Sequence, residues 1–447
     1  MRTRLPVLTT AAVLLLAAAG AGAASWKEQQ IAAAEKSESI LRQAEKVRGL
    51  LAQYQILRAA YVADEGKAFR LIFGQYLSWH QTYLGLHDEA QRSFSIQQIP
   101  EKQDAPSPLE GDAWTLQPAA DVVARLAANE RAVFFNEAHN AAITRSFTVA
   151  MLPRLRELGY THFAAETLYE TDKDLARRGY VNEESGFYTR EPVYAEMVRT
   201  ALKLGFTVVA YEADSEAVGD AREREQARNL YTRVFKNNPQ ARVVVNAGYA
   251  HIVESGKYLG GASMAQHFRK IAHIDPLTLE QTMMMPHDEA VQDHPYYRAL
   301  LARGPLTQPS ILVDRDGKPW SLREGQYDAS VILPPYAREK SGRQSWLSLG
   351  GARVPYNVDG EICRSRMPCL LEARYAGDGD DAVPADRIVI GLPDAKISDL
   401  ENRLRTTDDI QTDLYLRPGR YRLRAISAEN QVISTQNINV SNRERQP

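Results

Sequence analysis

The first part of the chain has the apolar spacing of helices. Between residues 25 and 93, apolar side chains recur at steps of three and four and therefore lie on one helical face. This series comprises Ile40, Ala44, Val47, Leu51, Tyr54, Leu57 and Tyr61. Gly66 interrupts the series, and the aromatic-rich stretch 69–83 predicts a second helix folded back on the first. We expect a helical hairpin, followed by a linker at residues 103–108.

Residues from about 112 to 335 alternate between strand and helix patterns. Short apolar runs lie at 132–135, 162–165, 207–211 and 242–246, and amphipathic stretches lie at 119–128, 141–158, 192–204 and 221–235. This alternation indicates βαβ units and a parallel sheet covered on both faces. A further apolar run at 282–285 could add a strand, and Asp316-Gly317 predicts a hairpin turn between residues 311–313 and Trp320.

Beyond about residue 340 the helical periodicity fades, apart from a short helix expected near residues 397–404. Short strands are predicted at 346–349, 370–375, 388–390, 414–416, 421–425 and 438–440, with a turn at Pro418-Gly419. Such strands resemble a small β-sandwich. The predicted fold is therefore α/β: a parallel sheet flanked by helices, with an N-terminal helical hairpin and a C-terminal β-sandwich-like domain. The expected limits of these parts are 24–108, 109–338 and 339–447.

Residues 1–23 have the three parts of a secretory signal peptide. Arg2 and Arg4 precede an apolar run at 7–19, and the small residues Ala21-Gly22-Ala23 follow it. The run is short for a membrane span, which favours a cleaved signal over the alternative of an uncleaved anchor helix. No cysteine lies near the cleavage point, so we expect no lipid anchor. The sequence predicts a periplasmic or secreted protein whose mature chain begins near Ala24.

Composition narrows the functional classes. The 447 residues are 44% hydrophobic and 25% charged, with a net charge of −2, which are ordinary values for a globular protein of two or three domains. Because a nucleic-acid binder would show a basic excess, we expect no nucleic-acid partner. In an oxidising compartment Cys363 and Cys369 predict one short-loop disulfide. The alternative, a soft metal site, would need further Cys or His residues nearby.

Acidic and histidine residues follow four consecutive predicted strands. These endings are, in chain order, Glu137 with His139, Glu166, Glu212 with Asp214, and Tyr249 with His251. The carboxyl ends of parallel strands open onto one edge of the sheet, where such folds place their sites. A core strand has no packing reason to end in a carboxylate, because an unpaired buried charge is costly. The pattern predicts a shared site; the alternative is that polar residues collect where strand ends meet solvent.

These residue types suit two related chemistries. Imidazoles and carboxylates are the usual ligands of a catalytic zinc, manganese or similar divalent ion, with an open position for water. A remaining carboxylate can take the proton from metal-bound water. Without a metal, His139 could itself act as the general base, held in one tautomer by a carboxylate. Gly248 would let the backbone pass close to the site.

Three stretches together resemble a known superfamily. Residues 133–140 (VFFNEAHN), 165–166 (AE) and 248–251 (GYAH) are similar to the motifs that join erythromycin esterases, Tiki/TraB metalloproteases and ChaN-type haem-binding proteins. That signature is Gly-Glu-x-(x)-His at the first strand, a glutamate after the second and a later Gly-x-x-His. The resemblance covers about residues 112–290. The family's first glycine is Asn136 here, a residue that tolerates left-handed backbone better than most.

The resemblance implies roles for the matching residues. It implies that His139, Glu166 and His251 are metal ligands or catalytic groups. The expected cofactor is a divalent ion of the zinc or manganese class, with haem as the alternative. Glu137 matches the signature glutamate, which implies a base or an orienting group. In a ChaN-like protein, Tyr249 or one of the two histidines would contact haem.

Other residues have weaker claims. Glu212 is a supporting acid among the catalytic candidates, and Asp214 is a second one. Arg145 could bind a substrate carboxylate or oxyanion, although a solvated helix arginine is the simpler interpretation. The remaining histidines are interpreted as structural or interface residues, except that His287 could join the same sheet edge: His80, His87, His162, His267 and His273.

The predicted function is that of an exported hydrolase. Water, activated by a metal or by His139, would attack an ester, lactone or amide carbonyl of a small-molecule or peptide substrate. The first alternative is a haem- or ligand-binding protein of the ChaN kind without turnover. A further alternative is a scaffold whose β-rich tail binds a partner or a surface glycan. No membrane span is expected in the mature chain.

Overall fold

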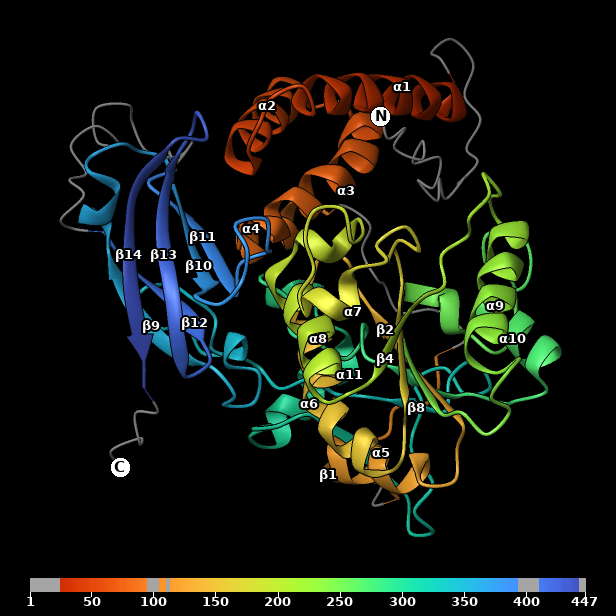
Figure 1. Cartoon of the computed structure of the whole chain (residues 1–447). Helices are drawn as coiled ribbons and strands as arrows, with labels where there is room; N and C mark the ends of the chain where they lie inside the picture. Colours follow the sequence, from red (N-terminus) through yellow and green to blue (C-terminus); the bar gives the residue numbers. More distant parts are fainter. Residues whose placement is uncertain (1–24, 95–103, 110–112, 393–409, 442–447) are drawn as a thin grey trace. The chain divides into compact units, whose positions relative to one another are not determined.

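The computed structural model describes residues 25–94, 104–109, 113–392 and 410–441 (Figure 1). The predicted signal peptide and the short helix near 397–404 lie outside these ranges, and so does the first residue of the predicted linker. Two compact units are distinguished, and each is described by itself. Unit 1 takes its described residues from Gln97–Thr189 and Glu196–Tyr336, and unit 2 from Val13–Ile96, Arg190–Ala195 and Ala337–Pro447. The domain limits drawn from the sequence remain predictions.

The expected hairpin of residues 25–94 is a succession of shorter helices. These are α1 (Trp26–Ala44), α2 (Leu50–Ala63), α3 (Lys67–Tyr83) and α4 (His87–Ser93). Ser25 and Glu28 form a capping box that starts α1, and Gly49, with φ of 95°, starts α2. His80 and His87 belong to this region, where His80 Nδ1 bonds to the Tyr76 carbonyl oxygen. None of the described helices is long and apolar enough to cross a membrane.

Unit 1 is built on a parallel sheet, as the alternating pattern predicts. Its strands are β2 (Ala132–Glu137), β3 (His162–Ala165), β4 (Thr207–Ala210), β5 (Val243–Gly248), β6 (Leu277–Glu280) and β8 (Ala329–Ser330), in the order β4-β3-β5-β2-β6-β8. The pairs between them are parallel. The connecting helices are α5 (Ala119–Ala127), α6 (Ile143–Glu157), α7 (Leu175–Arg178), α8 (Pro192–Lys203), α9 (Asp220–Val234) and α10 (Met264–Ala272). The predicted α/β class is confirmed.

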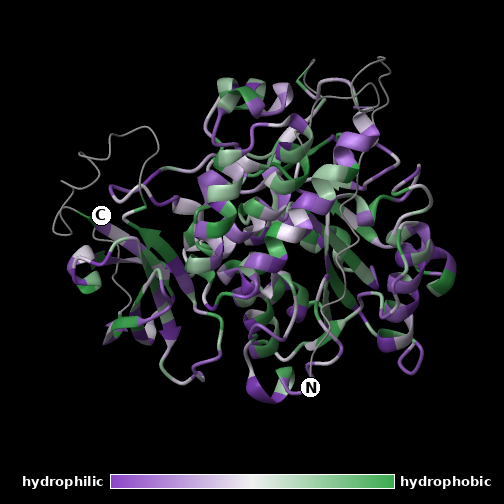
Figure 2. Ribbon diagram, turned by 90° about the horizontal axis from the view of Figure 1, so that it is seen from above, coloured by the Kyte–Doolittle hydropathy of each residue, from purple (hydrophilic) through white to green (hydrophobic). Residues whose placement is uncertain are grey.

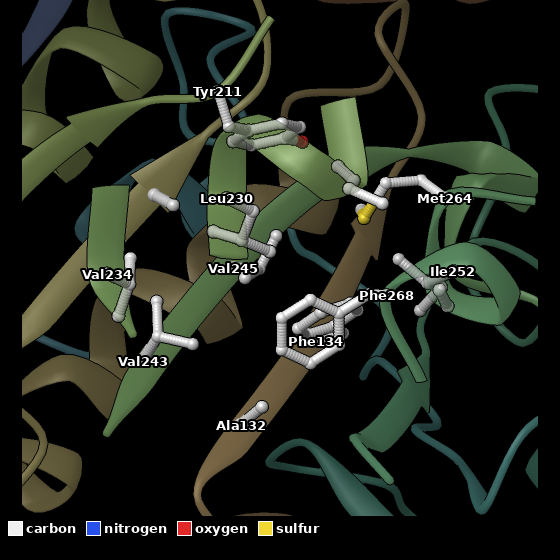
Figure 3. Close-up of a cluster of buried hydrophobic side chains, with 14 of the residues drawn as sticks. Ala132, Phe134, Tyr211, Leu230, Val234, Val243, Val245, Ile252, Met264 and Phe268 are labelled. Atoms are coloured by element: carbon white, nitrogen blue, oxygen red, sulfur yellow. The ribbon is translucent and has the colours of Figure 1, made fainter. Parts of the chain in front are cut away.

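Alternate side chains of the strands supply two buried faces. On one face, Phe134 and Val245 pack with Leu230 of α9 and Phe268 of α10 (Figure 3). On the other, Phe135 meets Phe147 of α6 with ring centroids 6.1 Å apart. The strands are accordingly coloured mainly as hydrophobic in Figure 2, whereas the surrounding helices carry many hydrophilic positions. A sheet covered on both faces leaves its carboxyl edge as the place for polar side chains.

The register brings the ends of β2, β3 and β5 together. Glu137 pairs with Gly248, and Ala165 pairs with Asn246, so β5 lies between the strands that carry Glu137 and Glu166. Strands β2 and β5 end at the same level, and β3 ends two residues before it, so that Glu166 follows at nearly the same level. Residues more than a hundred positions apart in the chain therefore meet at one edge.

Two expected strands are wrong. Residues 282–285 form a bend, and the strand is β6, just before them. The Glu280 carboxylate accepts hydrogen bonds from the Thr282 and Met283 backbone N–H groups, which turns the chain at that point. Residues 346–349 were expected to be extended, but Ser345–Ser348 is the 3-10 helix η4, which ends at Leu349 with φ of 48°.

The rest of unit 1 includes a two-stranded pair, β1 (Thr115–Pro118) with β7 (Ser310–Val313). The turn predicted at Asp316-Gly317 follows β7, where Asp314 N donates to the Lys318 carbonyl oxygen. The remaining helical segments are α11 (Pro295–Arg303), η2 (Tyr249–Ile252) and η3 (Ala290–Gln292). The segment η1 (Tyr188–Arg190) begins in unit 1 and leads into α8.

In unit 2 the C-terminal strands form antiparallel sheets. One has the order β11 (Asp386–Ile390), β10 (Cys369–Tyr375), β13 (Gly419–Ser427), β14 (Val432–Val440), and the other pairs β12 (Gln411–Leu416) with β9 (Val354–Asp359). Cys363, at the end of η5 (Gly360–Cys363), is bonded to Cys369 at the start of β10. The predicted β-rich C-terminal region and its disulfide are confirmed.

Candidate active site

The first carboxylate–histidine pair lies where β2 ends. Glu137 is its last residue, and Glu137 Oε1 accepts a hydrogen bond from His139 Nδ1 at 2.8 Å. The chain turns tightly here, because Ala138 N donates to Thr144 Oγ1 at 3.1 Å in the first turn of α6. A carboxylate on Nδ1 favours the tautomer of neutral His139 that carries its proton on that atom, which makes Nε2 the acceptor atom of the ring.

Arg145 contradicts the interpretation as a solvated helix arginine. The residue is fully buried, and its guanidinium binds both oxygens of Glu137, with Nη2 3.0 Å from Oε1 and Nε bonded to Oε2. Burial by itself would raise the pKa of the Glu137 carboxyl, but the Arg145 charge and the bond from His139 lower it to about 2. Arg145 is buried because the first turns of α6 face the end of β2, where the buried Glu137 carboxylate needs a positive partner.

Glu166 and Gly248 form the centre of the cluster. Glu166 follows β3, is 3% exposed, and its Oε2 atom accepts a hydrogen bond from Gly248 N. A Cβ atom on Gly248 would lie 2.3 Å from both Cε1 and Nε2 of His139 and 3.0 Å from Glu166 Oε2. Any side chain at this position would displace the histidine. Gly248 therefore allows the close backbone approach that the sequence suggests.

The second carboxylate–histidine pair joins η2 to α9. His251 Nδ1 donates to Glu223 Oε2 at 2.8 Å, and the same oxygen accepts from Met264 N, at the start of α10. Burial lowers the pKa of His251, but the negative charges of Glu223 and Glu166 outweigh it, so the pKa is raised. The two carboxylates therefore favour the protonated form of His251.

Both imidazoles turn their Nε2 atoms toward one carboxylate. Glu166 Oε1 lies 3.4 Å from His251 Nε2, and Glu166 Oε2 lies 4.0 Å from His139 Nε2. Burial raises the pKa of Glu166, but the charges of His251, His139 and Arg222 lower it to about 2. The structure thus brings together Glu137, His139, Glu166 and His251 in unit 1, as the strand-end pattern predicted.

Glu212 reaches this cluster through an arginine. Arg222 of α9 bonds to Glu212 with Nε–Oε1 and Nη2–Oε2 distances of 3.0 and 2.9 Å, and its Nη2 lies 3.4 Å from Glu166 Oε1. Burial by itself would lower the pKa of Arg222, but the carboxylates of Glu212 and Glu166 have the larger effect, so the pKa is raised. Asp214 is not brought in, because it is exposed and pairs with Arg233 at 2.8 Å.

Tyr249 and Asn136 shape the edge of the cluster. The Tyr249 hydroxyl donates to Asn140 Oδ1 at 2.9 Å, and burial raises its pKa. Asn136 donates from Nδ2 to the Tyr249 carbonyl oxygen, and its Oδ1 accepts from Gln281 N at 2.8 Å. Asn136 lies in the extended strand β2, where it pairs with Ala247, so no left-handed turn is formed at this position. Where the superfamily motif has glycine, the asparagine side chain instead adds hydrogen bonds to two neighbouring segments.

Histidines outside the cluster have other partners. His162 Nδ1 bonds to Thr161 Oγ1, and His267 Nε2 bonds to Asp220 Oδ1. His273 ends α10 with φ of 53°. His287 Nδ1 bonds to Asp293 Oδ1 at 3.0 Å, which ties it to that aspartate and not to the cluster.

Sequence reasoning missed three residues of the cluster, namely Glu223, Arg222 and Tyr188. Glu223 does have a signal, because Ala227, Leu230 and Val234 follow it at helical spacing and are buried with it on one face of α9. An acid at the head of an apolar stripe is costly to bury without a partner. Tyr188, which stacks on His139 with ring centroids 4.0 Å apart, has no comparable signal.

A metal fits this arrangement poorly. Among the described residues, no group of three or more His, Cys, Asp or Glu side chains is arranged to hold a metal ion. The Arg222 guanidinium lies 3.4 Å from Glu166 Oε1, where it would repel a second cation. The chemistry proposed below therefore routes no step through a metal.

Haem ligation also gains little from the geometry. The Nε2 atoms that would bind iron both face Glu166, at 3.4 and 4.0 Å, so an iron would have to displace that carboxylate. Tyr249 donates its hydroxyl proton to Asn140, and its raised pKa disfavours the phenolate.

Comparisons with known proteins find loosely similar structures. No family model and no curated protein matches the chain. Solved structures that match include the type III effector HopBA1, with 12% identity over 40% of this chain and 94% of that chain at a TM-score of 0.28. A structure of bacterial protein toxins matches with 13% identity over 56% of each chain, at a TM-score of 0.30. RRSP, a MARTX toxin effector domain from Vibrio vulnificus CMCP6, matches with 13% identity over 51% of each chain, at a TM-score of 0.27. This chain spans about half the length of these two toxin structures. At such TM-scores the likeness carries no argument about activity.

Proposed function

We propose that this protein is a hydrolase that activates water by acid–base chemistry to cleave an ester, lactone or amide bond. The observation that carries this proposal is the pair of carboxylate–histidine contacts, Glu137–His139 and Glu223–His251, whose Nε2 atoms both face Glu166. Two imidazole rings, each oriented by a carboxylate on Nδ1 and both facing one buried carboxylate, are arranged for proton transfer.

The two histidines take different roles in this proposal. His139 is the general base, because Glu137 is bonded to Nδ1 and thereby makes Nε2, which faces Glu166, the atom that takes a proton from water. As that proton moves to Nε2, the water oxygen bonds to the carbonyl carbon and the carbonyl oxygen gains the negative charge. His251, whose pKa is raised by the charges of Glu223 and Glu166, donates from Nε2 to that oxyanion and stabilises it. His139 then returns the proton to the leaving group, and the carbon–leaving group bond breaks.

Glu166 and the two arginines hold this arrangement. Glu166 orients the attacking water by accepting its second hydrogen bond between the two imidazoles. Arg145 keeps Glu137 ionised, so that Glu137 supports the imidazolium that forms on His139. Arg222 fixes Glu166 and links it to Glu212, which acts as a positioning residue.

The resemblance to the erythromycin esterase, Tiki/TraB and ChaN superfamily supports the same proposal. Its motif positions are filled here by Glu137, His139, Glu166 and His251, which lie in one cluster. The esterase branch is favoured, because the set fits proton transfer better than it fits a metal or haem. A small molecule or peptide remains the proposed substrate.

The test is hydrolysis of a panel of chromogenic esters, lactones and peptide amides by the purified mature chain. Replacing His139 or His251 by alanine should reduce kcat/KM by at least about 100-fold, because each change removes a proton-transfer or oxyanion contact. His162→Ala is the matched control, since His162 lies in the same sheet and bonds to Thr161. Full activity of His139→Ala, or equal loss in the control, would contradict the proposal. Activity that a chelator abolishes would return the metal-dependent alternative.

We also propose that the chain is exported, on the strength of residues 1–23 and of the Cys363–Cys369 bond, which is stable in oxidising compartments. Intact-mass measurement of protein recovered from the periplasm or medium should give a chain that begins near Ala24 and contains no free thiol. Retention of Met1, or recovery in the reducing cytosol alone, would refute this.

A further inference from the structure

The proposed catalytic groups are almost completely covered. The exposed fractions are 6% for His139, 5% for His251 and 3% for Glu166. A carbonyl group cannot reach His139 Nε2 from solvent unless one of the covering groups moves. The identity of that group follows from what surrounds the ring.

Most neighbours of the His139 ring belong to the sheet and its strand ends. Glu137 binds Nδ1, the Gly248 backbone lies against Cε1 and Nε2, and the edge of Tyr249 is 5.0 Å away by ring centroids. Tyr188 is different, because it comes from the connection between β3 and α8. Its ring stacks on His139 at 4.0 Å between centroids with an interplanar angle of 25°. Among the groups that cover His139, Tyr188 is thus the one contributed by a connection rather than by a strand end.

The connection is fastened to the residue after Glu166. Thr167 has a left-handed backbone conformation, with φ of 62°, and this conformation is strained for a β-branched residue. Thr167 accepts hydrogen bonds from Phe187 N at its carbonyl oxygen and from Tyr188 N at Oγ1, at 3.3 and 3.2 Å. A Cβ atom on Gly186 would lie 2.4 Å from the Thr167 carbonyl oxygen. Strain and close packing thus hold the Tyr188 ring in place beside the centre of the cluster.

We propose that Tyr188 is a positioning residue that covers His139, holds its ring with Nε2 toward Glu166, and moves aside when substrate enters. This inference rests on the proposed function, but its geometry concerns one ring and can be tested without a substrate. Stacking of two flat rings restrains rotation and excludes water from the covered face. The flatness of the ring is what matters, so phenylalanine should serve as well as tyrosine.

The test measures the rate at which diethyl pyrocarbonate modifies each histidine, followed by peptide mass spectrometry. In the wild-type chain His139 should react slowly. Tyr188→Ala should raise its rate by about tenfold, in line with the loss of one aromatic contact, while Tyr188→Phe should leave it near the wild-type rate. Half-buried His162, in the same sheet and away from this contact, is the internal reference and should not change.

A second variant guards against misfolding of the first. Gly186→Ala keeps the Tyr188 ring but forces its connection away from Thr167, so it should also raise the reactivity of His139. Gly304→Ala is the matched control, because a Cβ atom there meets nothing within 4 Å. Unchanged reactivity of His139 in both Tyr188→Ala and Gly186→Ala would overturn the proposal. An equal rise in Tyr188→Phe would also overturn it, by showing that the stacked ring is not the cover.

The two proposals fail in different ways. If no substrate is hydrolysed but His139 becomes reactive in Tyr188→Ala, the cover stands and the hydrolase proposal falls. If a substrate is hydrolysed but the reactivity of His139 does not change in Tyr188→Ala, the hydrolase proposal stands and the proposal that Tyr188 covers His139 falls. Where a substrate is in hand, Tyr188→Phe should keep kcat and Tyr188→Ala should lower it, when both are measured at a temperature at which each variant is folded.

Discussion

Single residues of the cluster are held by charge pairs that exclude water. Glu137 is fully buried, and the Arg145 guanidinium covers both of its oxygens. The pair costs desolvation when it forms, but removing one partner leaves an uncompensated charge in the core. The same logic applies to Glu166 with Arg222. These pairs therefore affect the stability of unit 1 and keep the carboxyls of Glu137 and Glu166 ionised.

Replacing Arg145 by methionine should lower the free energy of unfolding by about 3–5 kcal/mol, because it leaves the Glu137 charge buried without a partner. Urea-induced unfolding measures the change. Arg154→Met is the control on the same helix, since its side chain is 45% exposed and pairs with Asp121; it should cost less than about 1 kcal/mol. The double variant Glu137→Gln/Arg145→Met should recover part of the loss. A double variant as unstable as Arg145→Met would show that packing, not charge, is responsible.

Replacing Gly248 by alanine should push the His139 ring out of its position. The added Cβ would lie 2.3 Å from the ring, against the backbone of a central strand that cannot shift. We expect a loss of about 1–3 kcal/mol of stability from overpacking, together with loss of hydrolytic activity. Gly304→Ala, where the added carbon meets open space, should change neither quantity. Unaltered activity in Gly248→Ala would remove His139 from its proposed role.

At the scale of residues, the sequence predicted the site residues that lie next to strand ends. It missed those that other segments bring to the site when the chain folds. Glu137, Glu166 and His251 could be found because each lies within a few positions of a recognisable apolar run. Arg222 and Tyr188 come from a helix and a connection, and nothing in their local pattern distinguishes them from solvated residues. The burial of Arg145 likewise depends on where α6 packs and not on its own periodicity.

At the scale of elements, β5 is the strand that organises the site. It lies between β2 and β3, and continues directly into η2, which carries His251. The βαβ pattern of these elements could be predicted because hydrophobic runs and helices alternate regularly. Strand β6 was placed five residues too late, because Met283–Met285 is more apolar than the strand itself, and the turn is dictated by the Glu280 carboxylate. A side chain that redirects its own backbone is invisible to periodicity.

The junction of η2 with β6 contains a carboxyl group that is poised to titrate. Glu254 accepts a hydrogen bond from Thr278 of β6, and burial, with the nearby charges of Asp328 and Asp275, raises its pKa to about 7. The folded chain therefore binds this proton more tightly than the unfolded chain, whose carboxyl titrates near its ordinary pKa of 4.5. This contribution to stability is complete below that value and is lost as the pH rises through about 7.

Glu254→Gln should therefore stabilise the protein at high pH, because glutamine stays neutral and its amide oxygen still accepts from Thr278. The midpoint of thermal unfolding should exceed that of the wild type at about pH 8 by more than it does at about pH 5. Glu183→Gln is the control, because Glu183 is exposed and should show no such pH dependence. A difference that is the same at both pH values would show that Glu254 does not titrate in this range.

At the scale of the whole molecule, unit 2 joins the two ends of the chain. The sequence predicted separate N-terminal and C-terminal parts, because one has a helical pattern and the other has mainly the pattern of short strands. Within unit 2, however, Arg387 Nη1 donates to the Tyr83 carbonyl oxygen at 2.9 Å, and the rings of His87 and Trp346 meet at 5.0 Å. Asp88 binds both Arg338 and Gln344. Such contacts between distant segments leave no trace in local composition.

A chain cut between Tyr336 and Ala337 should therefore keep its C-terminal fragment. We expect an engineered protease site there to give two pieces that elute together in native size-exclusion chromatography and separate in denaturant, because the strands pack on the N-terminal helices that remain with the other piece. Asp88→Arg should release the fragment, since it turns the ion pair with Arg338 into a repulsion. Glu65→Arg, an equal charge reversal at an exposed site between α2 and α3, should not. The opposite outcome is that the fragment from residue 337 onward separates from the other piece without denaturant and still shows the β-rich circular dichroism expected of its strands. In that case the C-terminal region is an independent domain, and unit 2 is not a folding unit.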